Sequence, residues 1–261
     1  MRATVFMLVI ISIASLASAR TWRVDTAGTG DAPTLHAAMD SVMSGDIVLV
    51  EAGQYDLPAA LGVPGGVQLI GESGAAHTVI QRDAPPGIAA VYLLSGSSMR
   101  GIHLRASTSP VLYSHGGTDI VFCIVEATAY VSLVQMGGPT EFTRCLLLGG
   151  ALEFPLSAVT SILATTLLAG VAGSDFFSCD FAGAVDPSIE ISELDFNFSL
   201  DPEFCGLSGS GNYFLKSTSP CLPENNPFGF AVPIGPLPMG CGSVAVEEKT
   251  WGGVKALYRD R

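Results

Sequence analysis

Hydrophobic residues between Met99 and Phe181 recur in one small pattern: an apolar residue, two variable residues, a small or apolar residue, one spacer and a further apolar residue. The five instances are Met99/Ile102/Leu104, Ile120/Cys123/Val125, Phe142/Cys145/Leu147, Ile162/Thr165/Leu167 and Phe176/Cys179/Phe181. Their middle positions lie 21, 22, 20 and 14 residues apart. A step of about twenty residues predicts a solenoid, in which each repeat covers the hydrophobic face of the one before it.

The spacing inside the repeat predicts strands that bend. Side chains alternate every two residues along a strand, so a three-residue step needs a bend that turns both apolar positions inward. The bend positions are Gly101, Phe122, Arg144, Ala164 and Ser178. A chain that bends repeatedly between short strands forms coils of parallel strands stacked about 4.8 Å apart.

The N-terminal part predicts strands and one short helix. Strands are expected at 22–24, 46–50, 67–70, 79–81 and 91–94. Between the first two, Leu35, Ala38, Met39 and Val42 share one helical face, with Pro33 in the first turn and Gly45 after the end. A helix from Pro33 to Met43 is too short to be stable alone, so we expect it to pack on the solenoid.

The segment from Pro33 to Tyr55 resembles the opening of right-handed parallel β-helix proteins of the pectin-lyase-like superfamily. The similarity rests on the amphipathic helix, on Gly45-Asp46 before an apolar strand and on the turn Gly53-Gln54-Tyr55. With the repeat, it extends from about Trp22 to Ala184. It implies an all-β fold, a right-handed parallel β-helix solenoid with a short N-terminal capping helix.

The C-terminal part resembles the closing segment of exported bacterial β-helix proteins. The motifs are Asp201-Pro-Glu-Phe-Cys205, a stretch from Tyr213 to Cys221 that ends in Ser-Pro-Cys, and Ile234-Gly235. Residues 201–246 are therefore expected to close the solenoid formed by residues 20–200. Residues 247–261 form a tail, whose stretch Trp251–Arg259 is similar to short tails on such proteins.

Residues 1–19 have the layout of a secretory signal peptide. Arg2 precedes an apolar run from Val5 to Ile13, and Ala17-Ser18-Ala19 offers a cleavage site. The run is too short for a transmembrane span, so no membrane span is expected after cleavage. The sequence thus predicts a secreted protein, either extracellular or on the cell surface.

Composition excludes some partners. The formal net charge is -12, with 12 basic against 24 acidic residues. Nucleic acids and anionic membranes bind basic surfaces, so neither is an expected partner. Hydrophobic residues make up 48% of the chain and charged residues 14%, which favours a folded chain over a disordered one.

The six cysteines form two groups. Cys123, Cys145 and Cys179 occupy one slot of the repeat, where we expect stacked free thiols that pack the core. Cys205, Cys221 and Cys241 lie in the C-terminal part and are the disulfide candidates. Cys221 with Cys241 is the expected pair, which leaves Cys205 free or paired elsewhere.

Carbohydrate-cleaving β-helix enzymes, by resemblance, would carry calcium ligands with a base, or paired carboxylates, on the outer face of a sheet. The outward positions beside the middle slot read His103, Ile124, Leu146, Thr166 and Asp180, which is no carboxylate cluster. Arg105 beside Glu126 predicts an exposed ion pair. No catalytic residue and no cofactor are expected.

Two groups are candidates for binding. Arg100, His103 and Arg105 form the basic concentration on the repeats and are candidates for binding an acidic sugar, or a solvated strand edge. A calcium site is an alternative use of the irregular acidic group Asp186, Glu190, Glu193, Asp195, Asp201 and Glu203.

Three functional hypotheses follow. The favoured one is an exported, non-catalytic protein that binds an extracellular polysaccharide or a surface protein. The second, from the resemblance, is a polysaccharide lyase or glycoside hydrolase acting on an acidic polysaccharide. The third is a structural envelope component displayed through the tail Trp251–Arg259.

Overall fold

The computed structural model describes residues 18–83, 87–107, 110–128, 132–138, 140–152, 156–167, 174–183, 185, 195–206 and 212–241. The cleavage-site end of the predicted signal peptide is included, but most of that peptide and the tail Trp251–Arg259 lie outside the described residues. Within the described part, no helix is long and apolar enough to cross a membrane.

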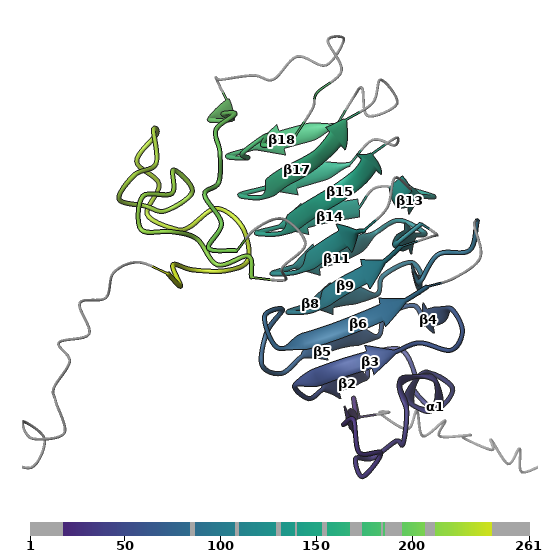
Figure 1. Ribbon diagram of the computed structural model, residues 1–261. Helices are drawn as coiled ribbons and strands as arrows, with labels where there is room; N and C mark the ends of the chain where they lie inside the picture. The colour runs from purple at the N-terminus through teal and green to yellow at the C-terminus, as the bar shows by residue number, and fades with distance from the viewer. Residues whose placement is uncertain are drawn as a thin grey trace, which may run out of the picture.

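One sheet of the described chain has eight parallel strands in the order β1-β2-β5-β8-β11-β14-β16-β18. Their bounds are β1 (Thr21–Val24), β2 (Ile47–Val50), β5 (Gln68–Gly71), β8 (Ser98–Arg100), β11 (Thr118–Val121), β14 (Thr140–Thr143), β16 (Ser157–Val159) and β18 (Asp175–Phe177). From β2 to β14, neighbours in the sheet are three strands apart in sequence, so each turn adds one strand to the stack (Figure 1). The predicted parallel solenoid is confirmed.

The second sheet has two arms that meet at one long strand. One arm contains β3 (Gly53–Asp56), β6 (Thr78–Arg82), β9 (His103–Ala106) and β12 (Ile124–Ala127), and the other β4 (Leu61–Val63), β7 (Val91–Leu93), β10 (Leu112–Ser114) and β13 (Ser132–Met136). They join at β15 (Leu146–Leu152), whose first half pairs with β12 and whose last residues pair with β13. Gly149 and Gly150, both at positive φ, let β15 turn this corner. β17 (Ile162–Leu167) pairs with β15 on its other side.

The bend of each repeat contains a residue in the left-handed backbone conformation. The bend residues are Gly101, Phe122, Arg144, Thr160, Ser178 and Phe196, with φ between 46° and 65°. The predicted fourth repeat, Ile162/Thr165/Leu167, is therefore wrong. Ala158 pairs with Phe142 and Phe176, which makes the fourth repeat Ala158/Ser161/Leu163.

The residues after the bends form a ladder of buried side chains that hydrogen-bond from turn to turn. Each donates to a backbone carbonyl of the preceding turn: Cys123 to Met99 (3.6 Å), Cys145 to Ile120 (3.2 Å), Ser161 to Phe142 (3.3 Å), Cys179 to Ala158 (3.2 Å) and Asn197 to Phe176 (2.9 Å). The ladder cysteines are free, fully buried thiols, as predicted. They act as donors as well as packing the core, because small donors satisfy carbonyls that bent strands leave unpaired.

The helix α1 (Leu35–Met39) is shorter than the predicted one. Thr34 caps its start by accepting a hydrogen bond from the Ala37 N–H. Leu35, Ala38 and Met39 are buried in the main core, and α1 contacts β1 and β4 at the N-terminal end of the stack (Figure 1). Residues 40–42 continue as a hydrogen-bonded turn, after which Gly45 donates to Gly66 and leads the chain into β2.

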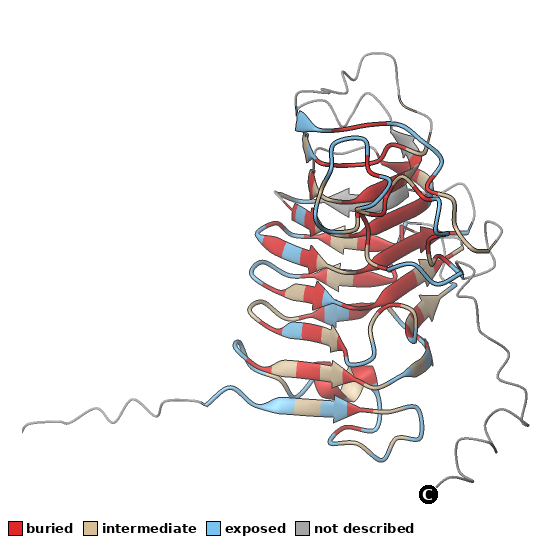
Figure 2. Cartoon of the chain, turned by 90° about the vertical axis from the view of Figure 1, so that its left-hand side faces the viewer, coloured by how far each residue is buried: buried red, intermediate tan, exposed pale blue. Residues whose placement is uncertain are grey.

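The C-terminal segment (residues 201–206 and 212–241) lies along the side of the solenoid (Figure 1). Figure 2 views the solenoid from the side on which the segment lies. A second hydrophobic core forms beneath it, joining Ile124, Leu146 and Ile162 of the strands to Leu215, Leu222 and Ile234 of the segment. Gly235 also donates to the Thr160 carbonyl over 2.8 Å.

Candidate functional site

An outward-facing column of side chains on the second sheet supports the C-terminal segment. Paired positions place His103, Ile124, Leu146 and Ile162 in register, with Asp180 bridged to Ile162. Ile162, and not the predicted Thr166, occupies the outward position of the fourth repeat, because this repeat begins four residues earlier than predicted. Apolar residues in an outward column would be costly in water, and the segment removes them from it.

Glu126 on β12 lies at the centre of a buried polar network. Its Oε1 accepts a hydrogen bond from the Tyr213 hydroxyl (2.8 Å), and its Oε2 from Nε2 of His103 (2.8 Å). Arg105 Nε lies 3.5 Å from the same Oε2. The Glu126 side chain is 6% exposed, whereas Arg105 is 38% exposed. The predicted Arg105–Glu126 ion pair is present, but its predicted exposure is wrong for Glu126, because Tyr213 and its segment cover the carboxylate.

These contacts keep Glu126 ionised. Burial alone would raise the pKa of the carboxyl, but hydrogen bonds from His103 and Tyr213 act in the other direction. The charges of His103 and Arg105 add to them, and the pKa of Glu126 lies below its usual value. A carboxylate with both oxygens engaged is an anchor for the segment and is poorly placed to exchange a proton.

A second acidic contact lies further along the column. Asp180 accepts a hydrogen bond from the Leu200 N–H (3.1 Å) and one from the Cys221 thiol (3.1 Å). Burial raises the pKa of Asp180 to about 6, although both hydrogen bonds lower it. Burial and the Asp180 carboxylate raise the pKa of Cys221. The thiol is therefore a neutral donor that holds the segment against the last turns.

A cleft of about 810 Å³ opens between the strands and the C-terminal segment. Its solenoid wall includes Arg105, Glu126, Leu148 and Ala164, one from each of β9, β12, β15 and β17. Its other wall belongs to the segment and includes Asp201, Glu203, Phe204, Tyr213 and Lys216. Arg105, Lys216, Asp201 and Glu203 keep part of their surface in solvent, so the cleft offers charges of both signs.

The structure separates the predicted basic group. Arg105 lines the cleft, but His103 is 7% exposed and faces Glu126 and Tyr213 beneath it. Arg100 ends β8 in the other sheet and lines a different cleft. The three residues lie close in sequence, but the bend at Gly101 turns them to different sides. Arg105 alone of the three belongs to the candidate site.

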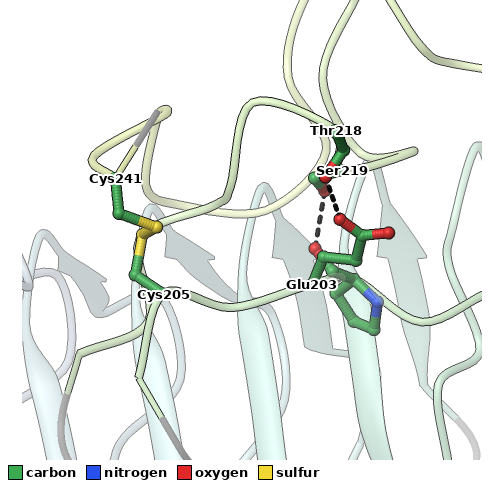
Figure 3. Close-up of a disulfide and its surroundings, with 6 residues drawn as sticks. Glu203, Cys205, Thr218, Ser219 and Cys241 are labelled. Atoms are coloured by element: carbon green, nitrogen blue, oxygen red, sulfur yellow. Dashed lines mark hydrogen bonds between the residues drawn. A yellow bond between two sulfur atoms is a disulfide. The ribbon is translucent and has the colours of Figure 1, made fainter. Parts of the chain in front are cut away.

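The disulfide joins Cys205 to Cys241, so the predicted Cys221–Cys241 pair is wrong (Figure 3). Cys221 is free and buried against Asp180, where it cannot meet Cys241. Near the disulfide, Glu203 accepts a hydrogen bond from the Thr218 hydroxyl, and Ser219 donates to the Pro202 carbonyl (2.6 Å). The disulfide and these bonds fix the cleft wall that carries Glu203 and Phe204.

The predicted calcium ligands fall in two groups. Asp186, Glu190 and Glu193 lie outside the described residues, while Asp195, Asp201 and Glu203 are described. Asp201 accepts a hydrogen bond from the Glu203 N–H over 2.8 Å. Among the described side chains, no group of three His, Cys, Asp or Glu is arranged to hold a metal ion.

The sequence reasoning missed two residues of this region, Tyr213 and Lys216, and did not identify the contacts of a third, Asp180. Tyr213 and Lys216 reach the cleft from the C-terminal segment, and Asp180, which the sequence places outward, is covered by Cys221 of the same segment. One signal was available: the outward residues Ile124 and Leu146 are apolar, and exposed sheet faces are ordinarily polar.

Comparison with solved structures gives two distant likenesses. A pectin methylesterase from carrot has a TM-score of 0.34 and 13% identity, covering 70% of this chain and 88% of its own. The pectate lyase Pel9A has a TM-score of 0.30 and 10% identity, covering 87% of this chain and 98% of its own. No protein-family model and no curated protein matches the chain. At this level of similarity, neither enzyme tells anything about the site.

Proposed function

We propose that this protein is an exported, non-catalytic β-solenoid that binds an extracellular glycan in the cleft between the solenoid and its C-terminal segment. The signal-like sequence at residues 1–19 supports export. The Cys205–Cys241 disulfide is of the kind that persists in oxidising compartments outside the cytosol.

The observation that carries the proposal is the composition of the cleft. Its volume of about 810 Å³ lies in the range of small-ligand sites. Arg105 and Lys216 supply donors, Asp201 and Glu203 supply acceptors, and Phe204 adds an aromatic ring. A sugar hydroxyl both donates and accepts hydrogen bonds, so a polyhydroxylated ligand uses groups of both kinds.

The state of the acids favours binding over cleavage. Glycoside hydrolysis uses two carboxyl groups that hold and exchange protons or attack the sugar. Glu126 is ionised, and both of its oxygens are engaged by His103, Tyr213 and Arg105. Its use as an acid or base would release Tyr213 and open the cleft wall. Glu203, on the cleft wall opposite Glu126, accepts a hydrogen bond from the Thr218 hydroxyl.

The test is binding to a panel of immobilised polysaccharides, measured together with cleavage. Arg105→Gln and Lys216→Gln are expected to weaken binding by about tenfold, the loss of one charge-assisted contact. The matched control is Arg23→Gln, because Arg23 lies on β1 and pairs with Glu51 and Glu72.

Two results would contradict the proposal. Release of unsaturated uronides or of new reducing ends by the wild-type protein would show that it is an enzyme. Failure to bind any polysaccharide, or equal losses in the cleft variants and in Arg23→Gln, would show that the cleft is not a glycan site.

A further inference from the structure

A second cleft, of about 450 Å³, lies at another part of the C-terminal segment and shares no lining residue with the first. The loop of residues 71–77 forms one side, and Phe214 with residues 236–238 of the segment forms another. Arg100, from the end of β8, and Phe122, from the next turn, also line the cleft. This volume suits a small ligand or one end of a larger one.

Two guanidinium groups flank the ring of Phe122. The Arg100 Cζ lies 5.2 Å and the Arg144 Cζ 4.7 Å from the ring centroid, both within cation–π distance. Phe122 and Arg144 are bend residues of successive turns, with φ of 54° and 52°. A bulky residue at such φ is strained. The guanidinium groups of Arg100 and Arg144, which carry like charges, are therefore held beside the Phe122 ring by backbone conformations that are strained at Phe122 and Arg144.

Neither charge is neutralised within the described part of the chain. Arg20, Arg23 and Arg105 each have a carboxylate within 4.0 Å, whereas Arg100 and Arg144 have none. The Arg144 Nε is buried without a hydrogen-bond partner, and burial lowers the pKa of its guanidinium. Glu72, the carboxylate in the lining of the cleft, is held by Arg23 at 3.4 Å.

Two neighbouring guanidinium groups without a carboxylate partner are unusual in a chain with twice as many acidic as basic residues. Arg100 is exposed at the end of β8, where it can reach a ligand, and Arg144 is partly buried with its Nε out of contact with solvent. A charged partner offsets the cost of removing part of a cation from water. An anion in the cleft would supply the missing partner. Two positive charges on one ring match a doubly charged group better than a single carboxylate, and guanidinium binds phosphate oxygens in bidentate fashion.

We propose that this second cleft binds a phosphate group, free or as a monoester, through Arg100, with Arg144 adding its charge across Phe122. The inference is independent of glycan binding in the first cleft, because the two clefts use different residues. Free phosphate and a phosphorylated sugar share this chemistry, and the experiment distinguishes them.

The experiment is isothermal titration of the full chain with inorganic phosphate, glucose 6-phosphate and acetate at constant ionic strength and neutral pH. Saturable binding of phosphate is expected, with acetate binding much more weakly. Arg100→Gln and Arg144→Gln are expected to reduce affinity by about tenfold or more. Arg20→Gln is the matched control, because Arg20 also stacks on a ring, that of Trp22 at 3.7 Å, but lies beside Asp31.

The outcomes are decisive in each direction. Equal affinity for both phosphates supports a site for the phosphate group alone, and tighter binding of the sugar phosphate supports a monoester site. No saturable binding, equal binding of acetate, or an equal loss in Arg20→Gln would overturn the proposal. A measurement on the wild-type protein avoids folding effects: phosphate should protect Arg100 from phenylglyoxal, and absence of protection counts against the site.

Discussion

Tyr213 donates its phenolic hydroxyl to Oε1 of Glu126 across 2.8 Å, joining residues 87 positions apart in the sequence. Glu126 belongs to the solenoid and Tyr213 to the C-terminal segment, so this bond, together with the second hydrophobic core, attaches the segment to the solenoid. It also buries a carboxylate, which is stable out of water only while its oxygens are hydrogen-bonded. The cleft above Glu126 exists because this attachment holds.

Acid should weaken this attachment. Burial acts to raise the pKa of Glu126, but the hydrogen bonds from His103 and Tyr213 together with the charges of His103 and Arg105 outweigh it, and the pKa in the folded protein lies below the usual value of 4.5. Its stabilising contribution is therefore present above about pH 4.5 and is lost as the pH falls through the lower folded value. Thermal unfolding of the wild type and of Glu126→Gln from neutral to acid pH measures it. Equal pH dependence in the two proteins below pH 4.5 would count against this role.

Asp180 should have the opposite pH dependence. Burial raises its pKa from 3.8 to about 6, so stability falls as the pH rises between these values. Asp180→Asn removes the ionisation and should stabilise the protein at pH 8 by up to about 3 kcal/mol, with little effect near pH 4. Urea unfolding at both pH values checks this, with Asp119→Asn, an exposed residue of β11, as control. Equal destabilisation at both pH values would be the contrary result.

Reduction of the disulfide should loosen the C-terminal segment. Cys205 and Cys241 are 36 positions apart, and closing a loop of that length contributes about 3–4 kcal/mol in the chain-entropy account. The double variant Cys205→Ser/Cys241→Ser should unfold at the temperature of the reduced wild type. Cys221→Ser is the control and should keep the sensitivity to reduction. If Cys221→Ser abolishes the sensitivity to reduction, Cys205 and Cys241 are not paired with each other.

The ladder predicts a specific cost for removing one hydroxyl. Ser161 Oγ accepts a hydrogen bond from the Cys145 N–H (3.0 Å), and its hydroxyl lies within donor distance of the Val159 carbonyl (2.9 Å) and the Phe142 carbonyl (3.3 Å). Ser161→Ala leaves a buried N–H unpaired, which costs about 1–3 kcal/mol. Ser161→Cys retains a hydrogen-bond donor and should lower the free energy of unfolding by less. Ser157→Ala on β16 should lower it least. Denaturant unfolding ranks the three variants, and an equal stability of Ser161→Ala and Ser157→Ala would contradict the ladder.

The fold was predictable because four of the five repeats carry large apolar residues in both flanking positions. Met99, Ile120 and Phe142 stack in register, as their spacing indicates. The fourth repeat was misplaced because Ala158/Ser161/Leu163 is less apolar than Ile162/Thr165/Leu167. Ser161 is tolerated in the core only through its bonds to neighbouring turns, which hydrophobic patterning does not register.

The site was less predictable, because it depends on contacts between distant parts of the chain. The outward column is visible in the sequence, but its cover comes from residues 201–241, which follow the last turns of the solenoid. The pairing of Cys241 with Cys205 depends on the path of that cover, and cysteine spacing alone does not determine connectivity. Arg105 was identified because it lies on a regular strand, and Lys216 was missed because it lies on an irregular segment.

A double-mutant cycle between Glu126 and Tyr213 tests the central claim most directly, namely that the C-terminal segment is anchored to the side of the solenoid. Unfolding free energies of Glu126→Gln, Tyr213→Phe and the double variant give the coupling between the two side chains. We predict a coupling of about 1.5–3 kcal/mol, as for a buried hydrogen bond to a charged group. A coupling within about 0.3 kcal/mol of zero would contradict the account.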